Sequence, residues 1–254
     1  MPRILILGGT AEARELSNRL AIRGDVAVTL SLAGRTVAPA PHNVPLRIGG
    51  FGGAAGLAAY VREEGIDILI DATHPYAAMI SANAAHAVSN LPTTLLALRR
   101  APWTRVAGDR WTEVEGVAQA VQALGAAPRR VFLTLGRKEI APFEAAPQHH
   151  YLVRSVDPIE PPLAVPYANY ILGRGPFIEA DDHALMARDN VDVVVAKNSG
   201  GSATYGKIAA ARALGIDVIL LRRPPLPAVP NVESVDDAVS WIDHALTSRM
   251  PRGV

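Results

Sequence analysis

The 254-residue sequence contains no cysteine, which excludes disulfides, thiolate metal sites, iron–sulfur clusters and cysteine nucleophiles. It also has no uncharged apolar run of the roughly 18–20 residues that a membrane span needs. Its formal net charge is only +1, so bulk charge predicts no nucleic-acid partner and no membrane surface. The first residues lack the layout of a signal peptide. We therefore expect a cytoplasmic protein, either a monomer or a weak homo-oligomer.

Several catalytic motifs are missing as well. The sequence has no phosphate loop of the G-K-[ST] type, no H-E-x-x-H motif and no G-x-S-x-G elbow. The segment Thr204-Tyr205-Gly206-Lys207 lacks the Tyr-x-x-x-Lys spacing of short-chain dehydrogenases. The seven histidines show no metal-ligand pattern, so no metal is predicted.

What the sequence does contain is an alternation of short apolar runs with stretches of helical length, which is typical of an α/β protein with parallel sheets. The predicted strands are Arg3–Leu7, Val26–Leu30, Ile66–Asp71, Thr93–Leu98, Arg130–Leu135, Tyr170–Leu172, Val191–Ala196 and Asp217–Leu221. The predicted helices are Ala11–Arg23, Ala54–Glu64, Ala77–Ser89, Gly116–Leu124, Ala180–Ala187, Thr204–Leu214 and Val235–Leu246.

The second half of the sequence echoes the first. Four short segments recur in the same order, beginning at Arg3 and Arg130, Gly65 and Asn190, Leu98 and Leu221, and Val114 and Val232. This order predicts two Rossmann-like parallel-sheet domains related by a weak internal repeat, at residues 1–127 and 128–254. A cleft between them is expected, because α/β ligand sites gather at the carboxyl ends of strands.

The first predicted strand leads into the turn Gly8-Gly9-Thr10-Ala11 and then into a helix. Glycines there allow the backbone to approach a pyrophosphate, and the amino end of a helix favours an anion. The turn is not the full G-x-G-x-x-G fingerprint. A tight turn in which Thr10 only caps the helix is the alternative.

The segment after the second predicted strand separates the two nicotinamide cofactors. An NAD site usually carries a carboxylate there, whereas an NADP site carries a cation. No carboxylate lies between Asp25 and Arg35, and Ser31, Gly34 and Arg35 suit a 2′-phosphate. NADPH is therefore the predicted cofactor. The alternative is that Arg35 is a solvent-facing loop residue.

Polar residues also follow the predicted strand Ile66–Asp71. Asp71 and Thr73 are candidates for cofactor binding, and His74 and Tyr76 are the candidate catalytic residues that contact nicotinamide or donate a proton. The alternative is that His74 only caps a helix or hydrogen-bonds a loop.

In the second half, cations and amides follow the strand ends and predict a pocket for a polyanionic substrate. Solvated surface charge is the alternative for several of them. The candidate substrate-binding residues are Arg137, Lys138, Arg174, Lys197, Asn198, Ser199 and Lys207.

Five ordered motifs together resemble the precorrin-6A reductase family of cobalamin (vitamin B12) biosynthesis. They are Gly8-Gly9-Thr10, Ser31-Leu32-Ala33-Gly34-Arg35, Asp71-Ala72-Thr73-His74-Pro75-Tyr76, Gly136-Arg137-Lys138-Glu139 and Lys197-Asn198-Ser199-Gly200. The resemblance implies NADPH-dependent reduction of a tetrapyrrole, precorrin-6A, to precorrin-6B, by hydride transfer to one ring carbon. It also implies that the first half holds the cofactor and the second half the substrate.

Two other functions stay open at this point. One is a uroporphyrinogen-synthase-like lyase, which is also two-halved and binds tetrapyrroles without a cofactor. The other is a non-catalytic module that binds NADPH or a tetrapyrrole. The glycine turn with Arg35 disfavours the lyase.

Overall fold

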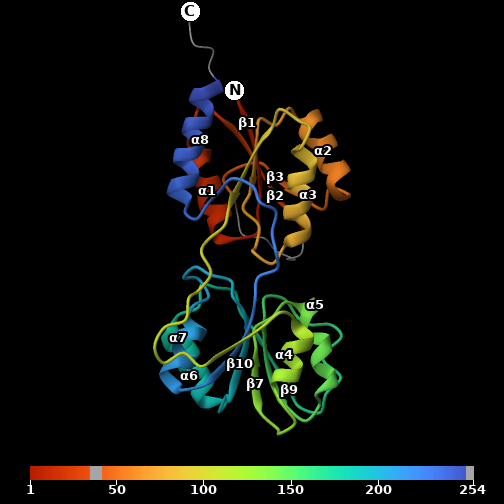
Figure 1. Ribbon diagram of the computed structural model, residues 1–254, viewed down its shortest axis with the longest axis vertical. Coiled ribbons are helices and arrows are strands. Elements are labelled where there is room, and N and C mark those ends of the chain that lie inside the picture. The colour runs from red at the N-terminus through yellow and green to blue at the C-terminus, as the bar shows by residue number, and fades with distance from the viewer. Residues whose placement is uncertain (35–41, 250–254) are drawn as a thin grey trace, which may run out of the picture. The chain divides into compact units, whose positions relative to one another are not determined.

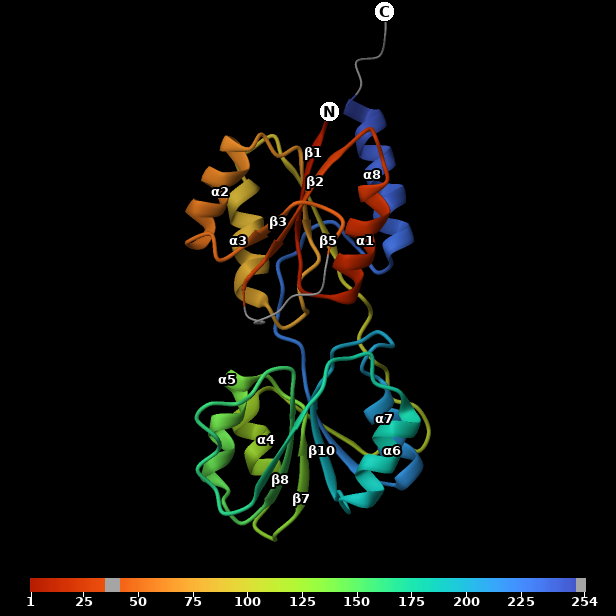
Figure 2. The same cartoon turned by 180° about the vertical axis from the view of Figure 1, so that it is seen from behind.

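The chain forms two compact units, which are described separately. The computed structural model describes residues 1–34 and 42–249. The first unit combines Met1–Ala101 with Pro225–Val254, and the second is Pro102–Pro224. Each is a parallel sheet covered by helices on both faces (Figures 1 and 2).

The sheet of the first unit has six parallel strands. Their spatial order is β12 (Asn231–Val232), β5 (Thr94–Leu98), β4 (Ile68–Asp71), β1 (Arg3–Leu7), β2 (Ala27–Leu32) and β3 (Leu46–Ile48). Helices α1 (Ala11–Ala21) and α8 (Val235–Arg249) lie side by side on one face, and α2 (Gly53–Glu63) and α3 (Ala78–Val88) cover the other (Figure 1). This strand order is that of a Rossmann fold, and its crossover point lies between β1 and β4.

Alternation along the strands builds a core on each face of this sheet. Ile4 and Ile6 of β1 pack in the cluster that includes α1 and α8, whereas Leu5 and Leu7 pack in the cluster beneath α2 and α3. Because both faces are covered, β1 reads as one apolar run rather than an alternating one.

The second unit repeats this arrangement. Its parallel strands lie in the order β6 (Trp111–Val114), β11 (Asp217–Leu221), β10 (Val193–Lys197), β7 (Arg130–Leu133), β8 (His150–Ser155) and β9 (Ala168–Leu172). One face carries α6 (Glu179–Arg188) and α7 (Gly206–Leu214). The other carries α4 (Val117–Ala123), α5 (Arg137–Ile140) and the 3₁₀ helix η1 (Ala141–Ala145).

The register of pairing confirms the predicted repeat. Ile4 of β1 pairs with Ile68 of β4, and Val131 of β7 pairs with Val193 of β10 at the corresponding place. The two sheets therefore match strand for strand, with β12 of the first in the place of β6 in the second.

The predicted domain boundary between residues 127 and 128 is wrong. Strand β6 and helix α4 precede that boundary, yet β6 pairs with β11 in the second unit. Strand β12 and helix α8 end the chain, yet β12 pairs with β5 in the first unit. Each sheet thus takes its sixth strand from the other half of the sequence, and the chain crosses between units near residues 101 and 225.

Short strands account for half of the elements that the sequence did not predict. Strands β3, β6 and β12 have three, four and two residues, too few for a pattern to appear. Strand β8 was missed despite its burial, as were α5 and η1. In the described part of the chain, no helix is long and apolar enough to cross a membrane.

The return of α8 to the first unit predicts the effect of truncating Ile242. This side chain is fully buried against the first sheet, so Ile242→Ala should lower the free energy of unfolding by about 2–5 kcal/mol. Urea denaturation followed by circular dichroism measures this. The matched control is Ile22→Ala, because Ile22 is 89% exposed and its truncation should change stability by less than about 0.5 kcal/mol. Equal effects of the two changes would contradict the packing of α8.

Candidate functional site

The turn between β1 and α1 contains two glycines, Gly8 and Gly9, so it exposes its backbone rather than side chains to a ligand. Gly9 has a φ of +119°, a conformation that favours glycine, and a Cβ built there would meet no atom within 4 Å. A Cβ on Gly8 would lie 2.6 Å from Cδ1 of Leu30, so any larger residue there would require the Leu30 side chain to move. The turn is therefore open on the side where a ligand would approach Gly9.

Thr10 caps helix α1, as one of the two interpretations of the sequence proposed, and it also bonds to a neighbouring loop. Its hydroxyl accepts a hydrogen bond from the Ala13 amide at 3.1 Å, as the N-cap of α1. The same hydroxyl donates to the carbonyl of Ala72 at 2.8 Å. Thr10 thus ties the β1–α1 turn to the loop that follows β4.

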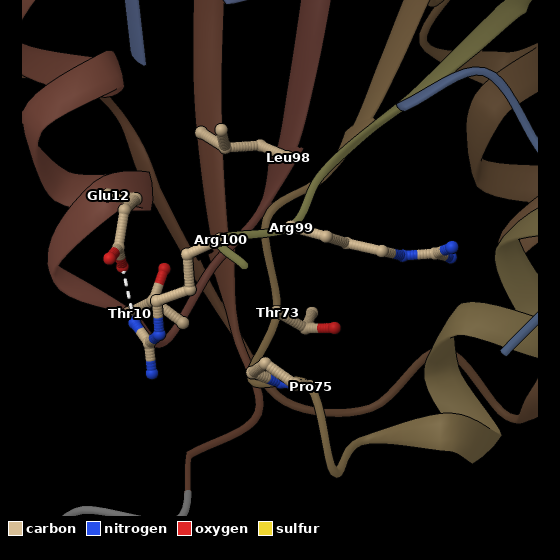
Figure 3. A pocket seen from close by; sticks show the side chains of 7 residues that line it. All are labelled: Thr10, Glu12, Thr73, Pro75, Leu98, Arg99 and Arg100. Carbon is tan, nitrogen blue, oxygen red and sulfur yellow. Dashed lines mark hydrogen bonds and ion pairs between the residues drawn. The ribbon is translucent and has the colours of Figure 1, made fainter. Parts of the chain in front are cut away.

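The amino end of α1 fits a phosphate group. Within the described residues, the amides of Ala11 and Glu12 have no protein hydrogen-bond acceptor, and such amides together with the helix dipole favour an anion. Glu12 would oppose that anion, but its carboxylate accepts a hydrogen bond from Arg100 at 2.6 Å (Figure 3). Arg100 follows β5 and lines the same small hollow as Thr10 and Thr73.

The loop after β4 is organised by a buried carboxylate. Oδ1 of Asp71 accepts hydrogen bonds from the amide and the hydroxyl of Thr73, at 3.2 and 2.7 Å. Farther along, Nδ1 of His74 accepts from the Tyr76 amide at 3.3 Å, and the two rings lie 5.7 Å apart. The structure thus brings the four predicted residues of this loop together beside the glycine turn. Asp71 faces inward, toward Thr73 and Arg99.

Arg99 supports this loop from β5. Its Nη2 lies 3.6 Å from Oδ2 of Asp71, and both side chains are largely buried. Its Nη1 donates to the carbonyl of Pro227 at 3.0 Å. Figure 3 shows Arg99 and Arg100 leaving the end of β5 in opposite directions.

At the end of β2, the structure places only part of the predicted set. Ser31 is buried and its carbonyl accepts from the Gly8 amide at 2.9 Å, and Gly34 has a φ of +69°. Arg35 lies outside the described residues. A cation that the sequence did not suggest, Arg47 of β3, lies beside Ser31, with Nη1 at 3.5 Å from the hydroxyl.

In the second unit, one ion pair joins two of the predicted strand ends. Lys197, the last residue of β10, lies 2.5 Å from Oε2 of Glu139 in the first turn of α5. The same carboxylate accepts from the Gly136 amide at 3.0 Å. Arg137 and Lys138 are exposed on this turn, and so is Arg174 after β9.

The other predicted residues of this unit are buried and contact protein groups. The side chain of Asn198 accepts a hydrogen bond from the backbone amide of Trp103 at 2.7 Å and donates one to the Trp103 carbonyl at 2.9 Å. Nζ of Lys207 donates to the Thr204 carbonyl at 2.8 Å and lies 5.2 Å from the Trp103 ring. The Ser199 carbonyl accepts from Arg223 at 3.0 Å. The structure therefore separates the exposed cations from a buried cluster around Trp103.

Comparison with known proteins finds one family that shares this sequence and fold. The family model described as Precorrin-6x reductase CbiJ/CobK matches residues 3–243. The chain is 58% identical to a precorrin-6A reductase of Sinorhizobium sp. over 96% of its length and 94% of the relative. It is 50% identical to the precorrin-6A reductase of Rhodobacter capsulatus over the full length of both. A solved structure named CobK precorrin-6A reductase superposes with a TM-score of 0.93 at 48% identity, covering all of both chains.

The chain belongs to the precorrin-6x reductase family. The resemblance seen in its five motifs is therefore confirmed. Membership of the precorrin-6x reductase family makes the chain a reductase, which goes against both the lyase and the non-catalytic alternatives.

Three arginines near the site, Arg47, Arg99 and Arg100, are not among the residues that the sequence predicted. Arg99 and Arg100 belong to the repeated segment that begins at Leu98. They follow the predicted strand Thr93–Leu98 directly, at the end where α/β ligand sites gather. Arg47 gave no signal, because strand β3 was not predicted.

The Asp71–Arg99 pair makes a testable contribution to stability. Arg99→Met leaves a buried carboxylate without its guanidinium and should lower the free energy of unfolding by about 3–5 kcal/mol. Adding Asp71→Asn should restore most of that loss, because the amide oxygen still accepts from Thr73 and no buried charge then lacks a partner. Urea denaturation of the single and double variants measures both.

A matched control is Arg3→Met, since the Arg3–Glu64 pair is about half exposed and its loss should cost less than about 1 kcal/mol. A double variant as unstable as Arg99→Met would show that the Asp71–Arg99 pair is not what holds the loop.

Proposed function

We propose that this chain reduces precorrin-6A to precorrin-6B in cobalamin biosynthesis, with NADPH as the reductant. The observation that carries the proposal is membership of the precorrin-6x reductase family, together with relatives that are named precorrin-6A reductase along their whole length. The β1–α1 turn supports a dinucleotide on physical grounds, because its open glycine and free helix amides suit a pyrophosphate.

In this proposal the first unit holds the cofactor. The backbone of Gly8, Gly9, Thr10 and Ala11 binds the pyrophosphate, and Ser31 and Gly34 lie toward the adenosine ribose. Bound NADPH supplies the hydride. Arg100 keeps the Glu12 carboxylate neutralised, so that it does not repel the phosphates.

The loop of Asp71, Thr73, His74 and Tyr76 lies toward the nicotinamide end, because it follows β4 on the other side of the crossover point. Two hydrogen bonds support its position: Thr10 donates to Ala72, and Thr73 donates to Asp71. We assign the proton that balances the hydride, delivered to the neighbouring ring carbon, to His74 or Tyr76. Fixing such groups against a reacting carbon is how positioning lowers a barrier.

The second unit binds the carboxylates of the macrocycle. The exposed cations Arg137, Lys138 and Arg174 follow strand ends and are suited to contact acetate and propionate groups. Lys197 is held by Glu139 at the turn that carries Arg137 and Lys138. The buried residues Asn198, Ser199 and Lys207 act through the Trp103 cluster, which fixes the shape of the segment that follows β10.

The direct test follows NADPH oxidation together with the visible absorption of precorrin-6A. We expect one NADPH to be consumed for each precorrin-6A lost, with no oxidation when precorrin-6A is omitted. NADH at the same concentration should support a much slower reaction. Binding of both ligands without turnover would favour the non-catalytic module, and loss of precorrin-6A without NADPH would favour the lyase.

A further inference from the structure

Arg47 is the middle residue of β3, and several contacts hold its side chain near the end of β2. In the parallel register of β2 and β3 it pairs with Ser31, and its guanidinium donates to the carbonyls of Gly49 and Gly50 at 2.7 and 2.9 Å. The guanidinium carbon also lies 3.7 Å from the centre of the Phe51 ring. The side chain therefore has one defined position beside the Ser31 hydroxyl.

Among the described residues, no carboxylate neutralises the positive charge of this guanidinium. Among residues 1–34 and 42–249, no carboxylate lies within 4 Å of Arg47; its contacts are carbonyls, a hydroxyl and the rings of Phe51 and Tyr60. Burial raises the pKa of Tyr60 above its ordinary value of 10.0, so that phenol carries no charge near neutral pH. Two carbonyls and one distant hydroxyl accept at most three of the five N–H donors of an arginine.

The position of Arg47 indicates what would neutralise it. In a Rossmann fold the 2′ oxygen of the adenosine ribose lies just beyond the end of the second strand, where a cation accommodates a 2′-phosphate. Arg47 reaches that place from the neighbouring strand β3. Its side chain is only half-exposed, and this partial burial strengthens its interaction with a charge.

We propose that Arg47 binds the 2′-phosphate of NADPH and sets the preference for NADPH over NADH. The inference rests on the proposed function, since it requires the β1–α1 turn to bind the rest of the dinucleotide. A planar guanidinium offers a phosphate two parallel hydrogen bonds, and the Ser31 hydroxyl is at hand for a further one. The Gly49 and Gly50 carbonyls and the Phe51 ring fix the side chain in advance, which lowers the entropic cost of binding.

Four variants of the full chain test the proposal: Arg47→Met, Arg47→Lys, Arg35→Met and Arg62→Met. Dissociation constants for NADPH and for NADH are measured separately by fluorescence titration. Arg47→Met should weaken NADPH by about 30-fold or more and NADH by less than about threefold, because only NADPH carries the 2′-phosphate. Arg47→Lys should give an intermediate loss, since it keeps the charge without the fork. Arg62→Met is the matched control, because Arg62 is exposed on α2, and it should change neither constant.

The outcomes separate this proposal from its rivals. Equal losses for the two nucleotides in Arg47→Met would mean that Arg47 only braces the glycine loop, and would overturn the proposal. A selective loss in Arg35→Met with none in Arg47→Met would assign the 2′-phosphate to Arg35 instead. If Arg47→Met does not fold, Arg47→Lys and Ser31→Ala give the same comparison of nucleotides. A wild-type chain that binds neither nucleotide would refute the proposed function itself, whereas equal affinity for both would refute only the role of Arg47.

Discussion

The hydrogen bond from the Thr10 hydroxyl to the carbonyl of Ala72 joins the two loops on which the site depends. It exists because β1 and β4 are parallel neighbours, so that their carboxyl ends meet at one edge of the sheet. Asp71 holds the far side of the second loop through Thr73, and Arg99 supports Asp71 from β5. Three neighbouring strands therefore fix one continuous surface of backbone amides and polar side chains.

The two units keep a common plan and differ where ligands would bind. In both, an acidic residue in the first turn of the helix after the central strand pairs with a cation from a later strand end: Glu12 with Arg100, and Glu139 with Lys197. The register places Leu135 of the second unit where the first has Gly8. Gly136 takes the place of Gly9 with a φ of −73° instead of +119°, so the backbone of the two turns follows a different path.

The sequence predicted the features of the fold that depend on residues close together in the chain. The buried runs of β1 and β4 and the glycine turn at Gly9 need only their own sequence to be recognised. The other features, such as the position of Arg47 and the sheet that each short strand joins, depend on pairing between distant segments. Arg47 reaches Ser31 only through β3, a strand of three residues, and the echo of Val114 in Val232 could reveal equivalent strands but not which sheet each would join. The burial of Asn198 against Trp103 likewise depends on a contact far along the chain.

We infer that the first unit binds NADPH across the ends of β1 and β2. A crystal structure of the chain with NADP⁺ tests this mode of binding. We expect the pyrophosphate on the amides of Gly9 to Glu12 and the 2′-phosphate within hydrogen-bond distance of Arg47. Density for the nucleotide at the β7–α5 turn of the second unit, or with its phosphates away from α1, would contradict it.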